Sequence, residues 1–413
     1  MDNYQLVIIG GGSAGIACAL GAYEAGLHDI LVIERDFEYG GILQQCIHNG
    51  FGLHTFNEEL SGPAYAEKYY ELIKDNKNIK FMFNSAVIKI DDKVLTVQSP
   101  DGLITIKAEA IVLATGCRER PAGAIGLKGN RLQGVYSAGT AQRYLNKEGF
   151  LVGKKVFILG SGDIGLIMAR RMSLEGAKVI GVAELQPYSN GLARNIKQCL
   201  EDYNIPLYLS HTVASVNGNE RLKSLTLVKV DEKLQPIKGS EEEIEVDCLL
   251  LSVGLIPENA LIEELGVKMD PKTKGAIVDE NYMTSVDGIF ACGNCLHVHD
   301  LVDYVSLEAK KAGKAAVEYI DGKTNDEEII TSKLGNGVNY MIPQYFHKGK
   351  DIEFSFRVNR VFKECNIHVH GDGLDKKIKK LGIVPSEMQK VLIKKEELDN
   401  LKGELSWEIE EWI

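Results

Sequence analysis

Residues Leu6–Glu34 read LVIIGGGSAGIACALGAYEAGLHDILVIE, which is the most informative segment of the sequence. An apolar run enters a glycine-rich turn, a helical pattern follows as far as Gly26, and a second apolar run ends on Glu34. The order predicts a strand, a turn, a helix and a second strand, with the dinucleotide fingerprint G-x-G-x-x-G in the first turn. We therefore expect this unit to bind a dinucleotide.

Each glycine of this fingerprint has a separate task. Gly10 makes the tight turn, Gly12 lets backbone N–H groups approach a pyrophosphate, and Gly15 lets the helix lie close to the strand. The N-terminus of the helix then offers its unsatisfied N–H donors to the phosphates, and the terminal acid accepts hydrogen bonds from a ribose diol. The residues expected to bind the first dinucleotide within this unit are Gly10, Gly12, Ser13, Ala14, Gly15, Glu34 and Arg35.

The chain contains the same unit a second time. Residues Phe157–Glu184 read FILGSGDIGLIMARRMSLEGAKVIGVAE, and their glycines and terminal acid lie 150 positions after those of the first unit. Two fingerprints with matching terminal acids predict two bound dinucleotides. The residues expected to bind the second are Gly160, Gly162, Asp163, Ile164, Gly165 and Glu184.

Length and composition restrict the remaining possibilities. With 413 residues the chain is long enough for two or three domains. A net charge of −11 argues against a nucleic-acid partner, and the basic run Lys376–Lys380 is more typical of a solvated turn or strand edge. No apolar run reaches the length of a membrane span. The first fingerprint begins so early that we expect no signal peptide, a cytoplasmic protein and reduced cysteines.

Further motifs follow in a fixed order. After the first acid come the pair Gly40-Gly41, the run ATG at 114–116, the second fingerprint, the turn VGLIP at 253–257 and the loop GIFACGN at 288–294. This order resembles the two-dinucleotide-domain flavoproteins related to the pyridine nucleotide-disulfide oxidoreductases. Within them, GGILQQCIHNGFGLH, ATGCRERP and HVHDLVD resemble the branch of anaerobic glycerol-3-phosphate dehydrogenases and of opine and proline dehydrogenase alpha subunits.

The resemblance implies an α/β fold with two Rossmann-like dinucleotide-binding domains. The expected domains are a discontinuous FAD-binding domain (1–117 and 255–325), an NAD-binding domain (118–254) and a small β-rich C-terminal domain (326–413). FAD would bind the first fingerprint and NAD(H) the second. The resemblance adds Gly254 to the NAD site, and it adds to the FAD site Gly41, Val87, Thr115, Gly116, Gly293, Asn294 and Val305.

Two further expectations concern the helix predicted at Asp303–Ile320 and Asn294 in the loop before it. Asp303 is expected to cap the helix, whose N-terminus would point at the flavin. Asn294 stands where relatives usually carry Asp, so the contact to the ribityl chain would be made by a neutral amide.

The cysteines distinguish subclasses of this superfamily. A redox disulfide needs C-x4-C soon after the glycine pair or C-x2-C near the second fingerprint, and neither Cys46 nor Cys117 has a partner at that spacing. Cys46 and His48 remain candidate catalytic residues near the flavin. The alternative role for Cys46 is packing in the core. His48 and His54 could each serve as a proton relay beside the flavin or as a packing residue.

A second group combines residue types that bind metals: Cys292, Cys295, His297 and His299. Both imidazoles would have to turn the same way from a short loop, and Cys292 lies in the loop expected to wrap the FAD pyrophosphate. We therefore expect these residues to line the flavin site and to bind no metal.

The C-terminal part shows strand patterns at Ile352–Val358, around His368 and His370, and at Val391–Ile393. The two histidines are expected on a polar strand face. Opine and proline dehydrogenase alpha subunits carry a cysteine-rich iron-sulfur segment here, whereas this chain has only Cys365, so no such cluster is expected.

The sequence therefore predicts a flavoenzyme that transfers hydride between NAD(H) and FAD. Because no outlet for the electrons is evident, we expect a partner flavoprotein dehydrogenase subunit that oxidises glycerol 3-phosphate or an amino acid. The β-rich part after residue 330 is the candidate docking surface for this partner, since strands with exposed edges invite pairing by another chain. The alternative is that it closes a homodimer. The alternatives for function are a stand-alone NADH oxidase or peroxidase, which needs a low-pKa thiol at Cys46, and a non-catalytic dinucleotide-sensing flavoprotein.

Overall fold

The computed structural model describes residues 2–323 and 328–412, and the chain divides into two compact units. The first unit contains the residues up to Leu43, Asn49–Cys117 and the chain from Pro257 onward. The second unit contains Gln44–His48 and Arg118–Ile256. The expected boundary at 325/326 lies outside the described residues.

The first unit is built on a seven-stranded sheet with the strand order β5-β2-β1-β8-β7-β6, in which β19 also pairs with β8. The strands around β1 run parallel, whereas β6, β7 and the start of β8 form an antiparallel extension. The strand bounds are β1 (Asp2–Ile9), β2 (Ile30–Ile33), β5 (Ile79–Met82), β6 (Ala86–Asp91), β7 (Val94–Ser99), β8 (Gly102–Leu113) and β19 (Ile289–Ala291).

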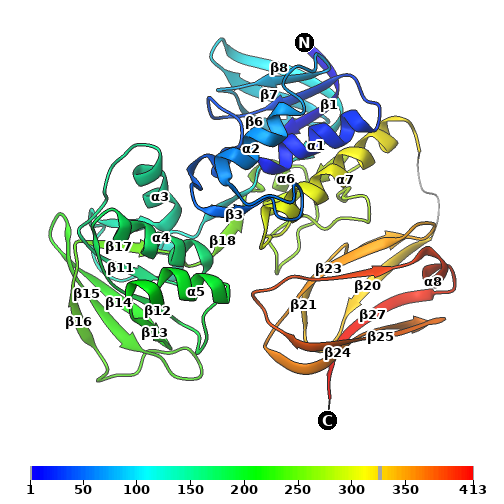
Figure 1. Ribbon diagram of the computed structural model, residues 1–413. Coiled ribbons are helices and arrows are strands. Elements are labelled where there is room, and N and C mark those ends of the chain that lie inside the picture. The colour runs from blue at the N-terminus through cyan, green and yellow to red at the C-terminus, as the bar shows by residue number, and fades with distance from the viewer. Residues whose placement is uncertain (1, 324–327, 413) are drawn as a thin grey trace. The chain divides into compact units, whose positions relative to one another are not determined.

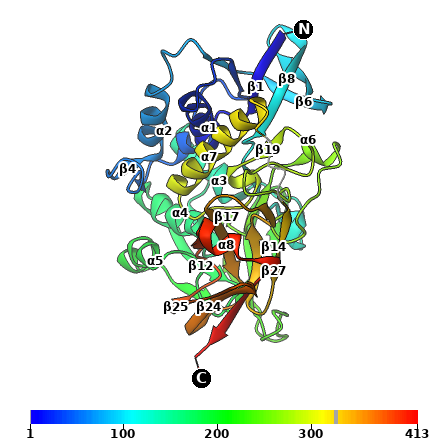
Figure 2. The same ribbon diagram turned by 90° about the vertical axis from the view of Figure 1, so that its right-hand side faces the viewer.

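Two helices lie side by side on this sheet, α1 (Ser13–Glu24) and α7 (Val302–Ile320) (Figures 1 and 2). Their backbones touch because glycine stands at both crossing points: a Cβ at Gly21 would lie 2.4 Å from the carbonyl oxygen of Lys310, and one at Gly313 would lie 2.2 Å from that of Cys18. The shorter elements of this unit are η1 (Gly41–Gln45, partly in the second unit), β3 (Asn49–Phe51), β4 (Leu60–Ser61), α2 (Gly62–Glu71), α6 (Ala260–Glu263) and η4 (Gly293–Cys295).

The second unit has a five-stranded parallel sheet with the order β10-β17-β11-β12-β13 and an antiparallel sheet β14-β15-β16. The sheet strands are β10 (Val135–Ser137), β11 (Lys155–Leu159), β12 (Lys178–Glu184), β13 (Leu207–Leu209), β14 (His211–Gly218), β15 (Leu222–Lys229), β16 (Glu242–Glu245) and β17 (Cys248–Leu251). The helices and the two short strands at its chain boundaries are β9 (Cys117–Glu119), η2 (Ala122–Ile125), α3 (Ala138–Asn146), α4 (Asp163–Leu174), α5 (Ala193–Cys199), η3 (Glu201–Tyr203) and β18 (Leu255–Pro257).

The C-terminal part is β-rich, with the sheets β22-β20-β27-β24-β25 and β21-β23-β26. Both sheets contribute to one apolar core, in which Phe354 of one contacts Trp407 of the other at 4.8 Å between ring centroids. The basic run Lys376–Lys380, predicted as a solvated turn or a strand edge, lies in β25 (Leu374–Ile383) at the edge of its sheet. The elements are β20 (Ile329–Leu334), β21 (Val338–Ile342), β22 (Tyr345–His347), β23 (Ile352–Val358), β24 (Phe362–Asp372), β25 (Leu374–Ile383), β26 (Gln389–Ile393), α8 (Lys395–Asp399) and β27 (Lys402–Glu411).

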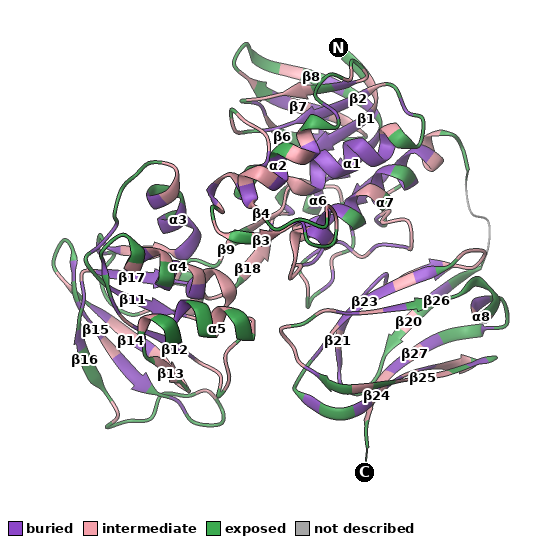
Figure 3. Cartoon of the chain, viewed as in Figure 1, coloured by how far each residue is buried: buried purple, intermediate pink, exposed green. Residues whose placement is uncertain are grey.

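Burial follows the layers of these sheets. Figure 3 shows buried residues along β1 and α1, which form the centre of the first unit. The predicted α/β fold with two Rossmann-like sheets and a β-rich C-terminal part is thus confirmed.

Candidate functional site

The two outer glycines of the first fingerprint are required by the fold. A Cβ at Gly10, where φ is +107°, would lie 2.4 Å from the carbonyl oxygen of Ala114. A Cβ at Gly15 would lie 1.8 Å from the carbonyl oxygen of Gly10. No side chain fits at either position, so these glycines allow the close approach of strand, turn and helix.

The middle glycine of each fingerprint is different. Gly12 caps α1 with φ −75° and ψ −168°, which any residue adopts, and a Cβ there would meet nothing within 4 Å. Gly162 caps α4 with φ −66° and ψ 162°, and its Cβ would meet only the hydroxyl of Ser252 at 3.7 Å. Neither glycine is explained by the protein itself, and open space beside a helix N-terminus fits a pyrophosphate.

Both terminal acids are buried and turned towards their fingerprints. The Glu34 carboxylate accepts hydrogen bonds from the N–H groups of Gly11 at 2.6 Å and Asp36 at 2.8 Å. The Glu184 carboxylate accepts from both the N–H and the hydroxyl of Ser161, at 3.0 and 2.7 Å. Each turn therefore ends beside a fixed buried acceptor, the arrangement expected for binding a ribose diol.

The glycine pair after Glu34 closes on the first turn. The N–H of Gly40 donates to the carbonyl oxygen of Gly11 at 2.8 Å, and a Cβ at Gly41 would lie 3.3 Å from Cα of Gly12. The backbone at Gly40 and Gly41, after Glu34, thus lies beside the first turn and Gly12.

Other predicted residues of the FAD site lie in the same unit. The Thr115 hydroxyl donates to the carbonyl oxygen of Glu258 at 2.7 Å, and Gly116 has φ +70° with open space at its Cβ. Ser13 and Ala14 lie in the first turn of α1, and Arg35 is exposed. Val87 lies in β6, Gly293 in η4 and Val305 on the buried side of α7.

The predicted residues of the NAD site lie in the second unit. Asp163, Ile164 and Gly165 form the first turn of α4, and Gly254, with φ +101°, follows β17. Cofactor contacts of all these residues remain predictions.

Asn294 already has protein partners. Its side-chain oxygen accepts from the backbone N–H of His299 at 3.0 Å, and its amide nitrogen lies 3.7 Å from the sulfur of Cys117. The amide holds the loop that precedes α7, which is a role that the sequence did not indicate.

Cys46 and His48 are grouped by the structure with the second unit, whereas the sequence placed them in the FAD domain. The Cys46 sulfur lies 3.8 Å from the side-chain oxygen of Gln142, and burial raises the pKa of this thiol to about 12. Burial and the nearby Arg194 lower the pKa of His48. A buried thiol is a poor nucleophile near neutral pH.

The prediction that Asp303 caps α7 was wrong. Leu301 is the N-cap, and Asp303 lies one residue inside the first turn with its carboxylate buried. That carboxylate accepts hydrogen bonds from the N–H groups of Gly52 at 3.1 Å and Thr55 at 2.9 Å. Asp303 is 251 positions from Gly52 and 248 from Thr55, so the local pattern could not reveal these contacts.

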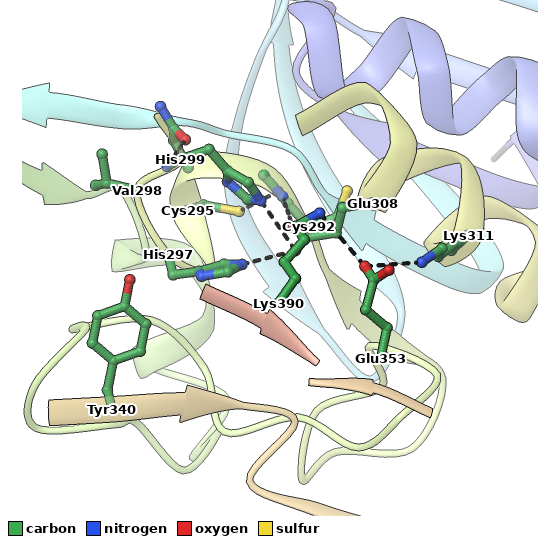
Figure 4. Close-up of polar contacts among 12 residues, drawn as sticks. Cys292, Cys295, His297, Val298, His299, Glu308, Lys311, Tyr340, Glu353 and Lys390 are labelled. Carbon is green, nitrogen blue, oxygen red and sulfur yellow. Dashed lines mark hydrogen bonds and ion pairs between the residues drawn. The ribbon is translucent and has the colours of Figure 1, made fainter. Parts of the chain in front are cut away.

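The cysteine and histidine group around residue 295 separates into two. The sulfur atoms of Cys292 and Cys295 lie 3.8 and 3.2 Å from the carbonyl oxygen of Leu113. Figure 4 shows the imidazoles of His297 and His299 turned towards Glu308. The argument that a short loop would keep both rings from turning the same way was therefore wrong.

Glu308 is the residue of this cluster that sequence reasoning missed. Its side chain is buried in α7, and one carboxylate oxygen accepts from the N–H of Gly293 at 2.7 Å. Burial alone would raise the pKa of Glu308, but His299 and His297 outweigh it and hold this pKa well below its ordinary value. Burial lowers the pKa of His297. An acid inside a regular helix gave no sequence signal for this partnership.

No helix in the described part of the chain is long and apolar enough to cross a membrane.

Comparisons with known proteins agree with this geometry. The thioredoxin reductase of Mycoplasma genitalium is 27% identical over 295 residues, covering 71% of this chain and 87% of that protein. The glutamate synthase [NADPH] small chain of Mycobacterium tuberculosis is 26% identical over 358 residues, covering 78% of this chain and 68% of that protein. The crystal structure of T. acidophilum thioredoxin reductase has a similar fold, with a TM-score of 0.64 and 22% identity, covering 78% of this chain and all of that chain.

A family profile matches residues 4–316, from within β1 to within α7. Relatives in this family use FAD and NAD(P)H, which fits the two open turns. The chain therefore belongs to the family described as pyridine nucleotide-disulphide oxidoreductase and is an FAD-dependent NAD(P)H oxidoreductase.

Proposed function

We propose that this chain carries hydride equivalents between NAD(H), bound at the second fingerprint, and FAD, bound at the first. We further propose that it is the electron-transfer subunit of a larger dehydrogenase that oxidises glycerol 3-phosphate or an amino acid. The observation that carries this proposal is the lack of a C-x4-C or C-x2-C disulfide motif at either place where disulfide reductases have one. Electrons on the flavin then need an acceptor or donor outside this chain.

The two open glycines support the binding of two dinucleotides. At Gly12 and Gly162 the backbone is ordinary, yet no side chain is present and the space beside each helix N-terminus is free of described protein atoms within 3.5 Å of a Cβ. The backbone N–H groups at each turn would hold a pyrophosphate, and Glu34 and Glu184 would each orient a ribose. When bound, FAD supplies the two-electron exchange with the nicotinamide.

The second site favours NAD(H) over NADP(H). The buried carboxylate of Glu184 lies where a 2′-phosphate would stand, and the segment Leu185–Asn190 contains no cation to receive that phosphate. The Glu184 carboxylate and a 2′-phosphate beside it would repel each other more strongly in a partly buried site than in water.

The role as a subunit is supported by the relatives. The glutamate synthase protein is described as a small chain, and so as one part of a larger enzyme. The stand-alone oxidase or peroxidase is less well supported, because it needs a thiolate and burial raises the pKa of Cys46 to about 12.

The test is an assay of the purified, FAD-loaded chain. It should reduce artificial dyes with NADH, and it should oxidise neither glycerol 3-phosphate nor amino acids until a co-purified partner is added. Rapid oxidation of either substrate by the chain alone would overturn the subunit proposal.

A further inference from the structure

His297, His299 and Glu308 form a compact buried cluster, which Figure 4 shows at the start of α7. Nε2 of His297 lies 2.8 Å and Nε2 of His299 lies 3.2 Å from the same carboxylate oxygen of Glu308. The exposed fractions of the three side chains are 0%, 2% and 7%. Two imidazoles from one loop thus converge on a single buried anion.

The framework of this cluster is fixed. Glu308 stands on a helix of nineteen residues, and its other carboxylate oxygen is held by the backbone N–H of Gly293. The loop of the histidines is held by Asn294, which accepts from the N–H of His299. Potential ligand groups that are oriented in this way lose little freedom when they bind an ion.

Protein atoms do not satisfy the cluster completely. Among the described residues, Nδ1 of His297 and Nδ1 of His299 are buried without a hydrogen-bond partner. Buried polar atoms of this kind usually have a partner, which is often a water molecule or an ion. Because Nε2 of each ring faces Glu308, each Nδ1 would carry the ring proton when the lone pair of Nε2 binds an ion.

Glu308 also reaches open space. It lines a cavity of about 280 Å³ together with Tyr282, Lys311 and Glu353, and Lys311 pairs with Glu353 at 3.2 Å on its wall. A cavity of this volume holds several water molecules. An ion beside Glu308 would then have water available as a further ligand.

We propose that His297, His299 and Glu308 bind a divalent first-row transition-metal ion of the zinc type. Their three ligand atoms lie within 4.8 Å of one another, and two imidazoles with one carboxylate are a donor set that zinc binds, with water in the fourth position. The ion would neutralise the buried carboxylate and join the histidine loop to α7. This site is independent of the proposed subunit role and of the electron route.

The chain offers a matched control. His368 and His370 on β24, with Glu408 on β27, have the same residue types and the same spacing between the histidines. Here His370 and Glu408 are only half-buried, with 40% and 35% of their side-chain surfaces accessible. We therefore expect this more accessible group to retain no zinc after desalting, so that loss of zinc on changing it would indicate casual binding.

The experiment measures zinc on the FAD-loaded protein. Wild type, His299→Gln and His370→Gln are stripped with a chelator, incubated with zinc sulfate and desalted, and zinc per chain is measured by mass spectrometry. Wild type and His370→Gln should retain one zinc that His299→Gln lacks. Glu308→Gln should keep the fold while weakening zinc by about tenfold or more, measured by competition with a chromophoric chelator.

Wild type that retains no zinc would overturn the proposal, and so would loss of zinc in His370→Gln but not in His299→Gln. Flavin absorbance and circular dichroism establish that each variant is folded. If His299→Gln does not fold, the decision rests on the zinc content of wild type and on the competition experiment with Glu308→Gln. One zinc per wild-type chain and weaker binding in Glu308→Gln support a metal site, whereas the absence of zinc shows a hydrogen-bonded network.

Discussion

The two fingerprints share their geometry but differ in what closes over each turn. Both begin with a glycine at positive φ, +107° at Gly10 and +100° at Gly160, and both end at a buried acid that accepts hydrogen bonds from the turn. The first turn is closed by main chain, because the N–H of Gly40 donates to the carbonyl oxygen of Gly11.

The second turn is closed by side chains. The carboxylate of Asp163, in the first turn of α4, accepts from the N–H of Leu192 at 2.9 Å and from the amide of Asn195 at 2.6 Å. The corresponding residue of the first unit is Ser13, 150 positions earlier. A backbone N–H is present whatever the side chain, whereas the closure at Asp163 can be removed by one substitution, so the second turn can be loosened by itself.

The largest expected effect comes from filling each open turn. Gly12→Val should yield protein without FAD, because the side chain occupies the space beside the helix N-terminus, while the ordinary backbone at Gly12 lets the chain fold. Gly162→Val should keep FAD and lose reduction by NADH. Flavin absorbance of the purified variants and rapid-mixing reduction by NADH measure the two effects.

Gly123→Val is the matched control for these variants. Gly123 also has open space at its Cβ and no positive φ, but it lies outside both fingerprints. It should keep FAD and NADH reduction. If Gly12→Val and Gly162→Val kept both properties as well, the assignment of the two sites would be wrong.

Whether a feature of the fold or of the site could be predicted depends on how far apart in the sequence the interacting residues are. The fingerprints, the terminal acids and the strand of alternating residues at 352–358 are local patterns, and the structure contains each of them. Asp303 was misjudged because its partners Gly52 and Thr55 come from a distant loop. Glu308 was missed because nothing in a regular helical pattern marks which acid faces a buried imidazole.

The choice of nicotinamide gives the next largest effect. In wild type, kcat/KM for NADH should exceed that for NADPH by at least about tenfold, the factor that 1.4 kcal/mol of repulsion at Glu184 produces. Glu184→Gln should narrow the ratio, because the amide is neutral. Steady-state kinetics with a dye acceptor measures both ratios, and equal efficiency of wild type with the two nucleotides would refute the prediction.

A smaller effect is expected at the side-chain closure of the second turn. Asp163→Ala removes the acceptor for Leu192 and Asn195, so KM for NADH should rise by about threefold to tenfold while FAD content stays unchanged. Asp163→Asn keeps an acceptor oxygen and should change KM by less than about twofold. Ser13→Ala is the matched control in the first unit. A lower KM in Asp163→Ala would show that its charge repels the dinucleotide more than its hydrogen bonds help.

The smallest effect is expected at Cys46, which follows the glycine pair but is grouped with the second unit. Burial raises the pKa of its thiol to about 12, so the thiolate is scarce below that pH and becomes common only above it. Cys46→Ser should therefore leave NADH-dependent dye reduction within about twofold of wild type. In wild type, alkylation of Cys46 by iodoacetamide should be slow at pH 7 and accelerate as the pH rises, as peptide mapping would show. Fast alkylation at pH 7, together with peroxide reduction that Cys46→Ser abolishes, would instead establish the peroxidase. The chain would then pass electrons from NADH through FAD and Cys46 to peroxide by itself, and the two turns would serve an enzyme that needs no partner subunit.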